Sequence, residues 1–145
     1  MKSAEHVQSV RDQYEAYPYP PRNPDDEAVR LENCWHDFLE LINFYCFQGR
    51  NNFSGPFKVL VAGGGTGDQT IFMAEQLRLN RNAEIVHVDI STHAMEIARR
   101  RAEVRRLTNI TWAHNSILDL PSLPLGQFDY ITCEGVLHHL EDPAA

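Results

Sequence analysis

Apolar residues recur at helical spacing near the start of the chain. The stripe lies on an otherwise polar segment and predicts an amphipathic helix over residues 5–17; it comprises Val7, Val10, Tyr14 and Tyr17. Several prolines follow, beginning with Pro18. They end this helix because proline lacks the backbone N–H that a helix needs.

A second stripe with the same spacing covers residues 26–49. An acidic pair, Asp25 and Asp26, can cap its start, and Gly49 is suited to its end. We therefore expect the longest helix of the chain here. Its apolar face comprises Ala28, Leu31, Trp35, Phe38, Ile42 and Tyr45.

The pattern changes at Phe57–Ala62, a continuous apolar run rich in β-branched residues, which is typical of a central parallel strand. Similar runs follow, and segments with helical spacing separate them. This alternation predicts βαβ units and a parallel sheet. We expect an α/β domain over residues 53–145, after a helical N-terminal cap over residues 1–52. The further strands span 84–89, 109–113 and 128–133, and the helices between them span 68–79 and 92–107.

Composition narrows the possible roles of this fold. The 145 residues are 43% hydrophobic, and 13 basic against 20 acidic residues give a net charge of −7, which disfavours a nucleic-acid or anionic-membrane partner. The longest apolar runs fall well short of the roughly 20 residues that span a bilayer. Three cysteines (Cys34, Cys46 and Cys133) without repeated spacing argue against a disulfide framework and favour a reducing cytoplasm.

Glycine fills four of the five positions in Gly63–Gly67, directly after the first expected strand. A glycine turn between a strand and a helix brings backbone N–H groups beside a ligand. A dinucleotide fingerprint would need a third glycine at position 68, where the chain has Asp68, and an acidic residue there is unfavourable beside a pyrophosphate. The loop thus favours a nucleoside ligand without phosphates, and a tight turn without a ligand is the alternative.

Asp89 ends the second expected strand, 22 residues after Gly67. A carboxylate in this place can accept hydrogen bonds from both hydroxyls of a ribose. The alternative role for Asp89 is a helix cap or a surface charge.

Four segments and the N-terminal Tyr/Pro-rich stretch together resemble the class I S-adenosylmethionine-dependent methyltransferases, in particular bacterial members with such a stretch. The resemblance covers nearly all of the chain. It implies a Rossmann-like sheet in the order 3-2-1-4, with S-adenosyl-L-methionine as cofactor. It also implies methyl transfer to an acceptor that the sequence does not specify, releasing S-adenosylhomocysteine. The segments are Val59–Thr70, Val86–Ser91, Asn115–Pro121, Phe128–Pro143 and the stretch Tyr14–Arg22.

The resemblance also implies which residues bind the cofactor. The glycines would pass under the methionine part and the ribose, and Asp89 would bind the ribose hydroxyls. The side chains after the second and third strands would contact adenine, and those after the fourth would line the methionine end. Two positions depart from many relatives, Val61 and Ser116, where an acidic residue is common. The implied set is Gly63, Gly64, Gly65, Gly67, Asp89, Ile90, Ser116, Ile117, Glu134 and Gly135.

Two adjacent histidines, His138 and His139, follow the fourth expected strand, where ligands bind in parallel sheets. A neutral imidazole could remove a proton from the methyl acceptor. The alternative is that they begin or cap a helix. Adjacent side chains on a helix point in different directions, so no metal site is expected.

A second group of candidates comes from the Tyr/Pro-rich stretch: Tyr14, Tyr17, Tyr19 and Arg22. Its aromatic rings could close over a sulfonium or shape the acceptor pocket, or the stretch could be a stiff connector. The arginines between Arg99 and Arg106 predict a solvated basic helix face.

Two alternatives to a methyltransferase remain: a catalytically silent binding or regulatory module of the same fold, and a nicotinamide-dependent oxidoreductase. The resemblance further implies three more strands after Pro143, so the sheet is expected to be incomplete at the C-terminus. An unpaired fourth strand would then favour self-association through that edge.

Overall fold

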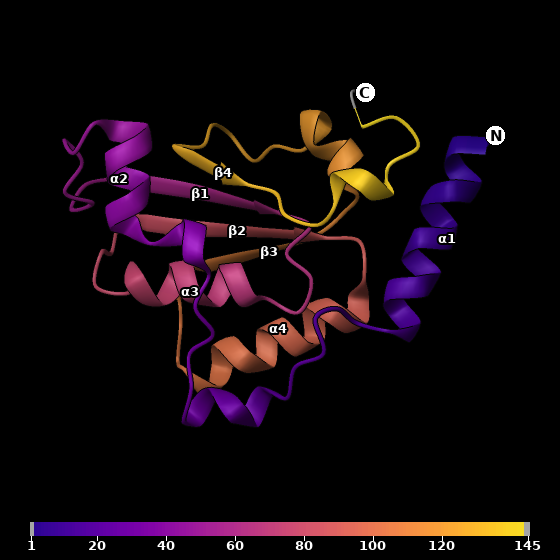
Figure 1. The fold of residues 1–145 in the computed structure, drawn as a ribbon, viewed down its shortest axis with the longest axis horizontal. Helices are drawn as coiled ribbons and strands as arrows, with labels where there is room; N and C mark the ends of the chain where they lie inside the picture. Colours follow the sequence, from indigo (N-terminus) through magenta and orange to yellow (C-terminus); the bar gives the residue numbers. More distant parts are fainter. Residues whose placement is uncertain (1, 144–145) are drawn as a thin grey trace.

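The computed structural model describes residues 2–143. Four strands form one parallel sheet in the order β3-β2-β1-β4, which confirms the predicted Rossmann-like order (Figure 1). In the central pair, Val59 of β1 lies opposite Ile85 of β2. The strands are β1 (Phe57–Ala62), β2 (Ala83–Asp89), β3 (Ile110–His114) and β4 (Tyr130–Thr132).

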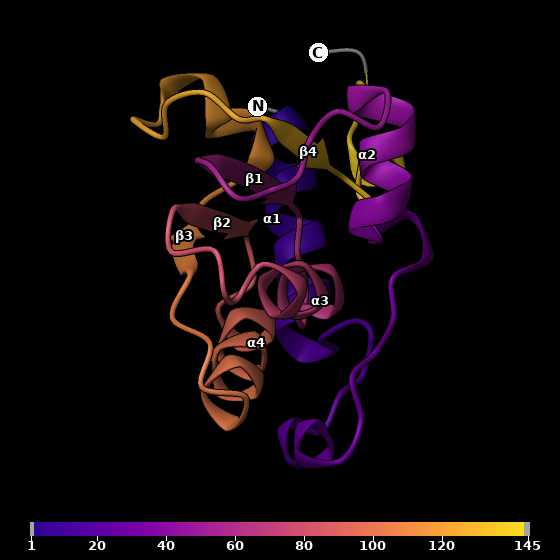
Figure 2. The same ribbon diagram turned by 90° about the vertical axis from the view of Figure 1, so that its left-hand side faces the viewer.

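Helices cover one face of this sheet. Figure 2 shows α3 (Asp68–Gln76) and α4 (Thr92–Val104) together on the same side. Val59, Val61 and Ile85 point into that layer and pack with α3 and with Ile42 of α2 (Leu39–Phe47). The opposite face is covered by less regular chain, which includes the 3-10 helix η3 (Ile117–Ser122). The helices expected from the sequence after β1 and β2 are confirmed, each three residues shorter at its C-terminal end.

The N-terminal helix, α1 (Lys2–Ala16), confirms the first predicted helix. Figure 1 shows it beyond the carboxyl ends of the strands. None of the helices within residues 2–143 has both the length and the apolar character needed to cross a membrane. The division of the chain at residue 52 stays a prediction.

The long helix predicted over residues 26–49 is wrong. Two 3-10 helices, η1 (Pro24–Ala28) and η2 (Trp35–Asp37), precede the shorter α2. Two acidic side chains explain the break, because Glu27 and Asp37 turn inward to bind donors from the rest of the fold. The indole of Trp35, expected in the core, is 70% exposed instead.

Candidate functional site

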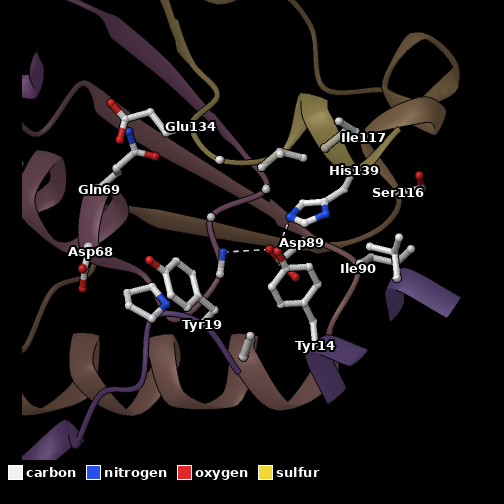
Figure 3. A pocket seen from close by; sticks show the side chains of 18 of the residues that line it. Tyr14, Tyr19, Asp68, Gln69, Asp89, Ile90, Ser116, Ile117, Glu134 and His139 are labelled. Atoms are coloured by element: carbon white, nitrogen blue, oxygen red, sulfur yellow. Dashed lines mark hydrogen bonds between the residues drawn. The ribbon is translucent and has the colours of Figure 1, made fainter. Parts of the chain in front are cut away.

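A cavity of about 470 Å³ lies at the carboxyl ends of the strands, between the glycine loop, α1 and the segment after β4. Figure 3 shows Asp68, Gln69 and Glu134 at one end of it, Ile90, Ser116 and Ile117 at the other, and Asp89 between. The cavity brings together most of the predicted site residues: Tyr14, Tyr19, Arg22, Gly63, Gly64, Gly65, Asp89, Ile90, Ser116, Ile117, Glu134, Gly135 and His139.

Three predicted residues lie outside the lining. Gly67 caps the start of α3 with a φ of 98° and packs against Ala98 of α4. Tyr17 is exposed to solvent. The ring of His138 lies beside that of His139, with centroids 4.0 Å apart, but His138 does not line the cavity.

The glycine loop is held from above by the Tyr/Pro-rich stretch. The Thr66 hydroxyl donates to the carbonyl of Pro20 at 2.6 Å. Gly65 has a φ of 52°, and a Cβ there would lie 2.5 Å from the carbonyl oxygen of Tyr19. Glycine is therefore required at position 65 by the chain that covers it, as well as by any ligand beneath.

Asp89 lies at the end of β2 and is 8% exposed. Its carboxylate accepts the backbone N–H of Gly65 at 2.7 Å and that of Ser91 at 2.8 Å. Burial raises the pKa of Asp89 above its ordinary value, and the backbone donors only partly oppose this. A carboxylate offers about four acceptor sites, so Asp89 can accept two further donors from a molecule in the cavity.

The end of the cavity lined by Ile90, Ser116 and Ile117, called the far end below, combines apolar walls with one hydroxyl. The Ser116 Oγ accepts the backbone N–H of Leu118 at 3.2 Å, which leaves its own hydrogen free to donate. Ile90 and Ile117 line this end. Val7 and Val10 of α1 also line the cavity, although they are not among the predicted site residues. Their apolar spacing on α1 was the available signal.

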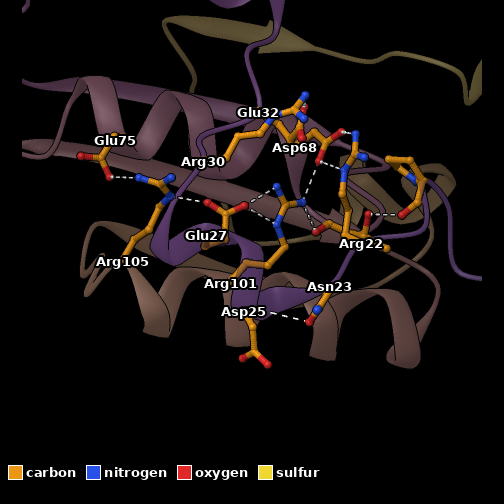
Figure 4. Close-up of polar contacts among 12 residues, drawn as sticks. Arg22, Asn23, Asp25, Glu27, Arg30, Glu32, Asp68, Glu75, Arg101 and Arg105 are labelled. Atoms are coloured by element: carbon orange, nitrogen blue, oxygen red, sulfur yellow. Dashed lines mark hydrogen bonds and ion pairs between the residues drawn. The ribbon is translucent and has the colours of Figure 1, made fainter.

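The opposite end, lined by Asp68, Gln69 and Glu134, is called the near end below. There, Asp68 binds two arginines. Arg22 donates from Nε at 2.8 Å and from Nη2 at 2.5 Å, and Arg101 donates from Nη1 at 2.7 Å (Figure 4). Burial alone would raise the pKa of Asp68, but these hydrogen bonds hold it below its ordinary value. Because its charge is compensated, the expectation that Asp68 repels a pyrophosphate loses its physical basis.

The prediction that the arginines between Arg99 and Arg106 form a solvated helix face is wrong for Arg101 and Arg105. Arg101 has a side chain that is 1% exposed, bonds the carbonyl of Thr66 at 2.8 Å and pairs with Glu27 at 2.6 Å. Arg105 binds the other oxygen of Glu27. Arg101 follows Ala94 and Ala98 on the buried stripe of α4, and this spacing was the signal that could have revealed it.

The cavity is bridged by side chains from α1 and from η4 (Leu137–His139). The Tyr14 hydroxyl lies 2.7 Å from the Nε2 of His139, and His6 donates to the His139 carbonyl at 2.6 Å. Burial, with the imidazoles of His138 and His6, lowers the pKa of His139. Its ring is therefore neutral near pH 7 and can accept the hydrogen of Tyr14.

Comparison with known proteins decides the family. A family model described as a methyltransferase domain matches residues 60–145, more than half of the chain. The chain belongs to this methyltransferase family. The match favours a methyltransferase over the nicotinamide-dependent oxidoreductase considered from the sequence.

Relatives of this methyltransferase domain are longer proteins. An uncharacterised protein of Synechococcus sp. is 39% identical over 138 residues, which are 94% of this chain and 32% of that protein. The ubiquinone biosynthesis O-methyltransferase of Acinetobacter baylyi is 31% identical over 88 residues, 61% of this chain and 35% of that enzyme. The chain thus spans about a third of the length of these relatives.

Solved structures share the fold. PKMT2 from Rickettsia typhi, in complex with AdoHcy, is similar with a TM-score of 0.58 and 27% identity, over 83% of this chain and 21% of that one. The magnesium protoporphyrin IX methyltransferase of Synechocystis, with bound SAH, gives a TM-score of 0.58 at 23% identity, over 92% of this chain and 60% of that one. The predicted α/β fold class is confirmed.

Proposed function

We propose that the cavity binds S-adenosyl-L-methionine and that the chain is the cofactor-binding part of a methyltransferase. The observation that carries this proposal is Asp89. Its carboxylate is buried at the cavity wall, is held in place by the N–H of Gly65, and keeps acceptor sites for two ribose hydroxyls.

The other lining residues fit the same ligand. Ile90 and Ile117 offer apolar surface to an adenine ring, and the Ser116 hydroxyl can donate to its edge. Gly63, Gly64 and Gly65 line the cavity, so the backbone of the glycine loop forms part of its wall. When bound, the cofactor supplies a methyl group activated on a sulfonium. The protein must hold an acceptor in line with that group and exclude water.

His139 is the side chain that we assign to proton removal from an acceptor that carries a proton. His139 lines the cavity and its lowered pKa keeps it neutral, as a base requires. Because its Nε2 already accepts the Tyr14 hydroxyl, the proton would pass through that hydroxyl: the Tyr14 oxygen takes the proton of the acceptor while its own hydrogen moves to Nε2. Tyr14, bonded to that nitrogen, would position the ring and close α1 over the ligand. His138 has no such role in this proposal because it lies outside the cavity lining.

The test is calorimetric titration of S-adenosylhomocysteine into the chain and into Asp89→Asn, which keeps the volume of the side chain. We expect saturable binding to the unaltered chain and a loss of at least about tenfold in Asp89→Asn, because one charged acceptor is removed. Asp26→Asn, an exposed carboxylate of η1, is the matched control and should bind normally.

Two results would contradict the proposal. Binding of NAD without binding of S-adenosylhomocysteine would revive the oxidoreductase. Equal affinity in Asp89→Asn and the unaltered chain would remove Asp89 from the site. Normal cofactor binding with no methyl transfer to any acceptor in broad screens of the longer protein would instead support the silent module.

The proposal extends to location and association. The three cysteines, all within the described residues, are free thiols, and we assign the chain to the reducing cytoplasm on that basis.

Within the described sheet β4 is an edge strand and its Ile131 is exposed, so we also propose self-association through this edge. A sedimentation measurement that shows a monomer at every concentration would contradict the proposed self-association.

A further inference from the structure

The glycine loop packs on the end of β2. The carbonyl of Val88 accepts the backbone N–H of Gly63 at 2.8 Å and that of Gly64 at 3.1 Å. The preceding residue, His87, makes the next contact. Its ring lies so close to Gly64 that a Cβ on that glycine would be 2.4 Å from it. His87 therefore limits how far this part of the loop can move toward the sheet.

The ring of His87 is also the reason why position 64 must be glycine. The φ of Gly64 lies outside the left-handed region, so its backbone conformation is open to other residues. Gly63 and Gly65 differ, because their φ values are 74° and 52°. The three atoms nearest to a Cβ on Gly64 all belong to the His87 imidazole, at 2.4 to 3.1 Å. Gly64 and His87 thus form a fitted pair, in which a residue without a side chain accommodates a large one.

Neighbouring elements hold this ring in place. His87 is fully buried, and its Nδ1 lies 2.8 Å from the hydroxyl of Thr70 on α3. Its ring centroid is 4.9 Å from that of Trp112 on β3. Burial, together with the charge of Arg99, lowers the pKa of His87 to about 3, so the ring is neutral near pH 7. The glycine loop therefore rests on a neutral ring that is fixed by its contacts.

Histidine is unfavourable at this position if the side chain only fills space. Its Nε2 is buried and has no hydrogen-bond partner among residues 2–143. A buried polar atom without a partner lowers the free energy of unfolding, which an apolar side chain of similar size would avoid. Residues that break a packing rule in this way are expected at functional sites.

We infer that His87 is a positioning residue for the S-adenosyl ligand. Its ring supports Gly64, and this support places the N–H of the next residue, Gly65, 2.7 Å from the carboxylate of Asp89. The hydrogen bond in turn orients Asp89 at the cavity wall. His87 does not line the cavity, so it acts through these neighbours. The inference rests on the proposed function and adds to it the residue that sets the geometry between the loop and Asp89.

A double-mutant cycle between His87 and Gly64 tests this inference by titration calorimetry. His87→Ala removes the support, so S-adenosylhomocysteine should bind about tenfold more weakly because the Gly65 N–H moves away from Asp89. Gly64→Ala should also weaken binding, because its methyl group clashes with the ring. In the double variant that methyl group occupies space that the ring has left. The double variant should therefore bind at least about threefold more tightly than either single variant.

Two further measurements separate positioning from a general effect on the fold. In His87→Ala, the acid loss of affinity should begin at a higher pH, because Asp89 loses a backbone donor and its pKa rises further. Ile85→Val is the matched control. Ile85 is fully buried two positions earlier on the same face of β2. Its substitution should lower the urea midpoint and leave the affinity unchanged.

Thr70→Val covers the case in which His87→Ala does not fold. It removes only the hydroxyl beside Nδ1 and keeps the shape of the side chain. We expect a loss of affinity of about two- to fivefold, because the ring is then less firmly held. Unchanged affinity in Thr70→Val would in that case overturn the inference.

The outcomes distinguish the inference from the proposed function. If His87→Ala binds S-adenosylhomocysteine normally while Asp89→Asn does not, the inference is overturned and the cofactor site stands. If the double variant binds no more tightly than the single variants, the ring does not set the position of the loop, and the inference is again overturned. If the unaltered chain does not bind the ligand, both are overturned.

Discussion

Asp68 and Asp89 both line the cavity, yet the protein treats their charges in opposite ways. Asp68 begins α3 and is bound by Arg22 and Arg101, which hold its pKa below the ordinary value. Asp89 ends β2, accepts only backbone N–H groups among its hydrogen bonds within residues 2–143, and its pKa is raised by burial. Two arginines compensate the charge of Asp68, whereas no cationic side chain among residues 2–143 is hydrogen-bonded to Asp89.

This difference has opposite consequences for stability. A depressed pKa means that ionised Asp68 stabilises the fold above its ordinary pKa of 3.8, and that this contribution is lost as pH falls toward the depressed value. A raised pKa means that ionising Asp89 costs stability as pH rises from 3.8 through the raised value. The near end of the cavity thus supports the fold, whereas the unpaired charge of Asp89 is available to donors on a ligand.

The largest expected effect comes from removing the arginine beneath Asp68. Arg101→Met deletes a fully buried cation and leaves Glu27 and Asp68 with fewer donors, so the free energy of unfolding should fall by about 3 to 5 kcal/mol. Urea denaturation measures this loss. Arg100→Met, on the exposed face of the same helix, should change it by less than about 0.5 kcal/mol. Equal effects of the two would show that the buried ion pairs do not stabilise this end.

The next largest effect tests how closely the glycine loop, which lines the cavity between Asp68 and Asp89, packs on the residue beneath it. A Cβ on Gly64 would lie 2.4 Å from the ring of His87, which is fully buried beneath the loop. Gly64→Ala should therefore lower the free energy of unfolding by about 1 to 3 kcal/mol through overpacking. It should also weaken the binding of S-adenosylhomocysteine, because the Gly65 N–H would move away from Asp89. Thermal melting and calorimetry measure the two effects.

Gly55→Ala is the matched control, because no atom lies within 4 Å of a Cβ at that position. It should leave both stability and affinity unchanged. If Gly64→Ala behaves like this control, the loop can move away from His87, and the spacing between the two ends is not rigid.

The contrast between the two ends also explains what the sequence could predict. The strand that ends at Asp89 and the glycine loop beside it are visible locally, as an apolar run followed by small residues, and parallel strands bring their carboxyl ends together. The partners of Asp68 come from positions 46 residues before it and 33 residues after it. The spacing of Arg101 after Ala94 and Ala98 places it on the buried stripe of α4, but no local pattern shows which distant acids it meets.

The failed prediction of a long N-terminal helix has a related cause. The spacing of Trp35 and Tyr45 suggests one buried face, but both side chains are exposed, while the carboxylate of Asp37 is fully buried. Hydropathy alone places an acid at the surface. Here the donors Gln69 and Tyr130 reverse that preference, and they belong to distant segments.

The pH dependence of affinity identifies which carboxylate meets the ligand. If Asp89 accepts the ribose hydroxyls, affinity for S-adenosylhomocysteine should fall as pH is lowered, with a midpoint above 3.8, by up to about tenfold per pH unit. Calorimetry between pH 7 and pH 4 measures the profile. Asp68→Asn should keep this midpoint because its own pKa lies lower, whereas Asp89→Asn should abolish the dependence. A flat profile in the unaltered chain would assign the binding contact elsewhere.

The smallest expected effect concerns the bridge that closes the cavity above Asp89. Tyr14→Phe removes the hydroxyl bonded to His139 but keeps the ring, so α1 should still pack while affinity for S-adenosylhomocysteine falls about two- to tenfold. Tyr17→Phe changes an exposed tyrosine outside the cavity and should have no effect. Because the bridge connects α1 to η4 across the ligand, the loss should appear mainly as faster dissociation in stopped-flow measurements. Unchanged dissociation in Tyr14→Phe would mean that α1 covers the Asp89 end without holding the ligand there.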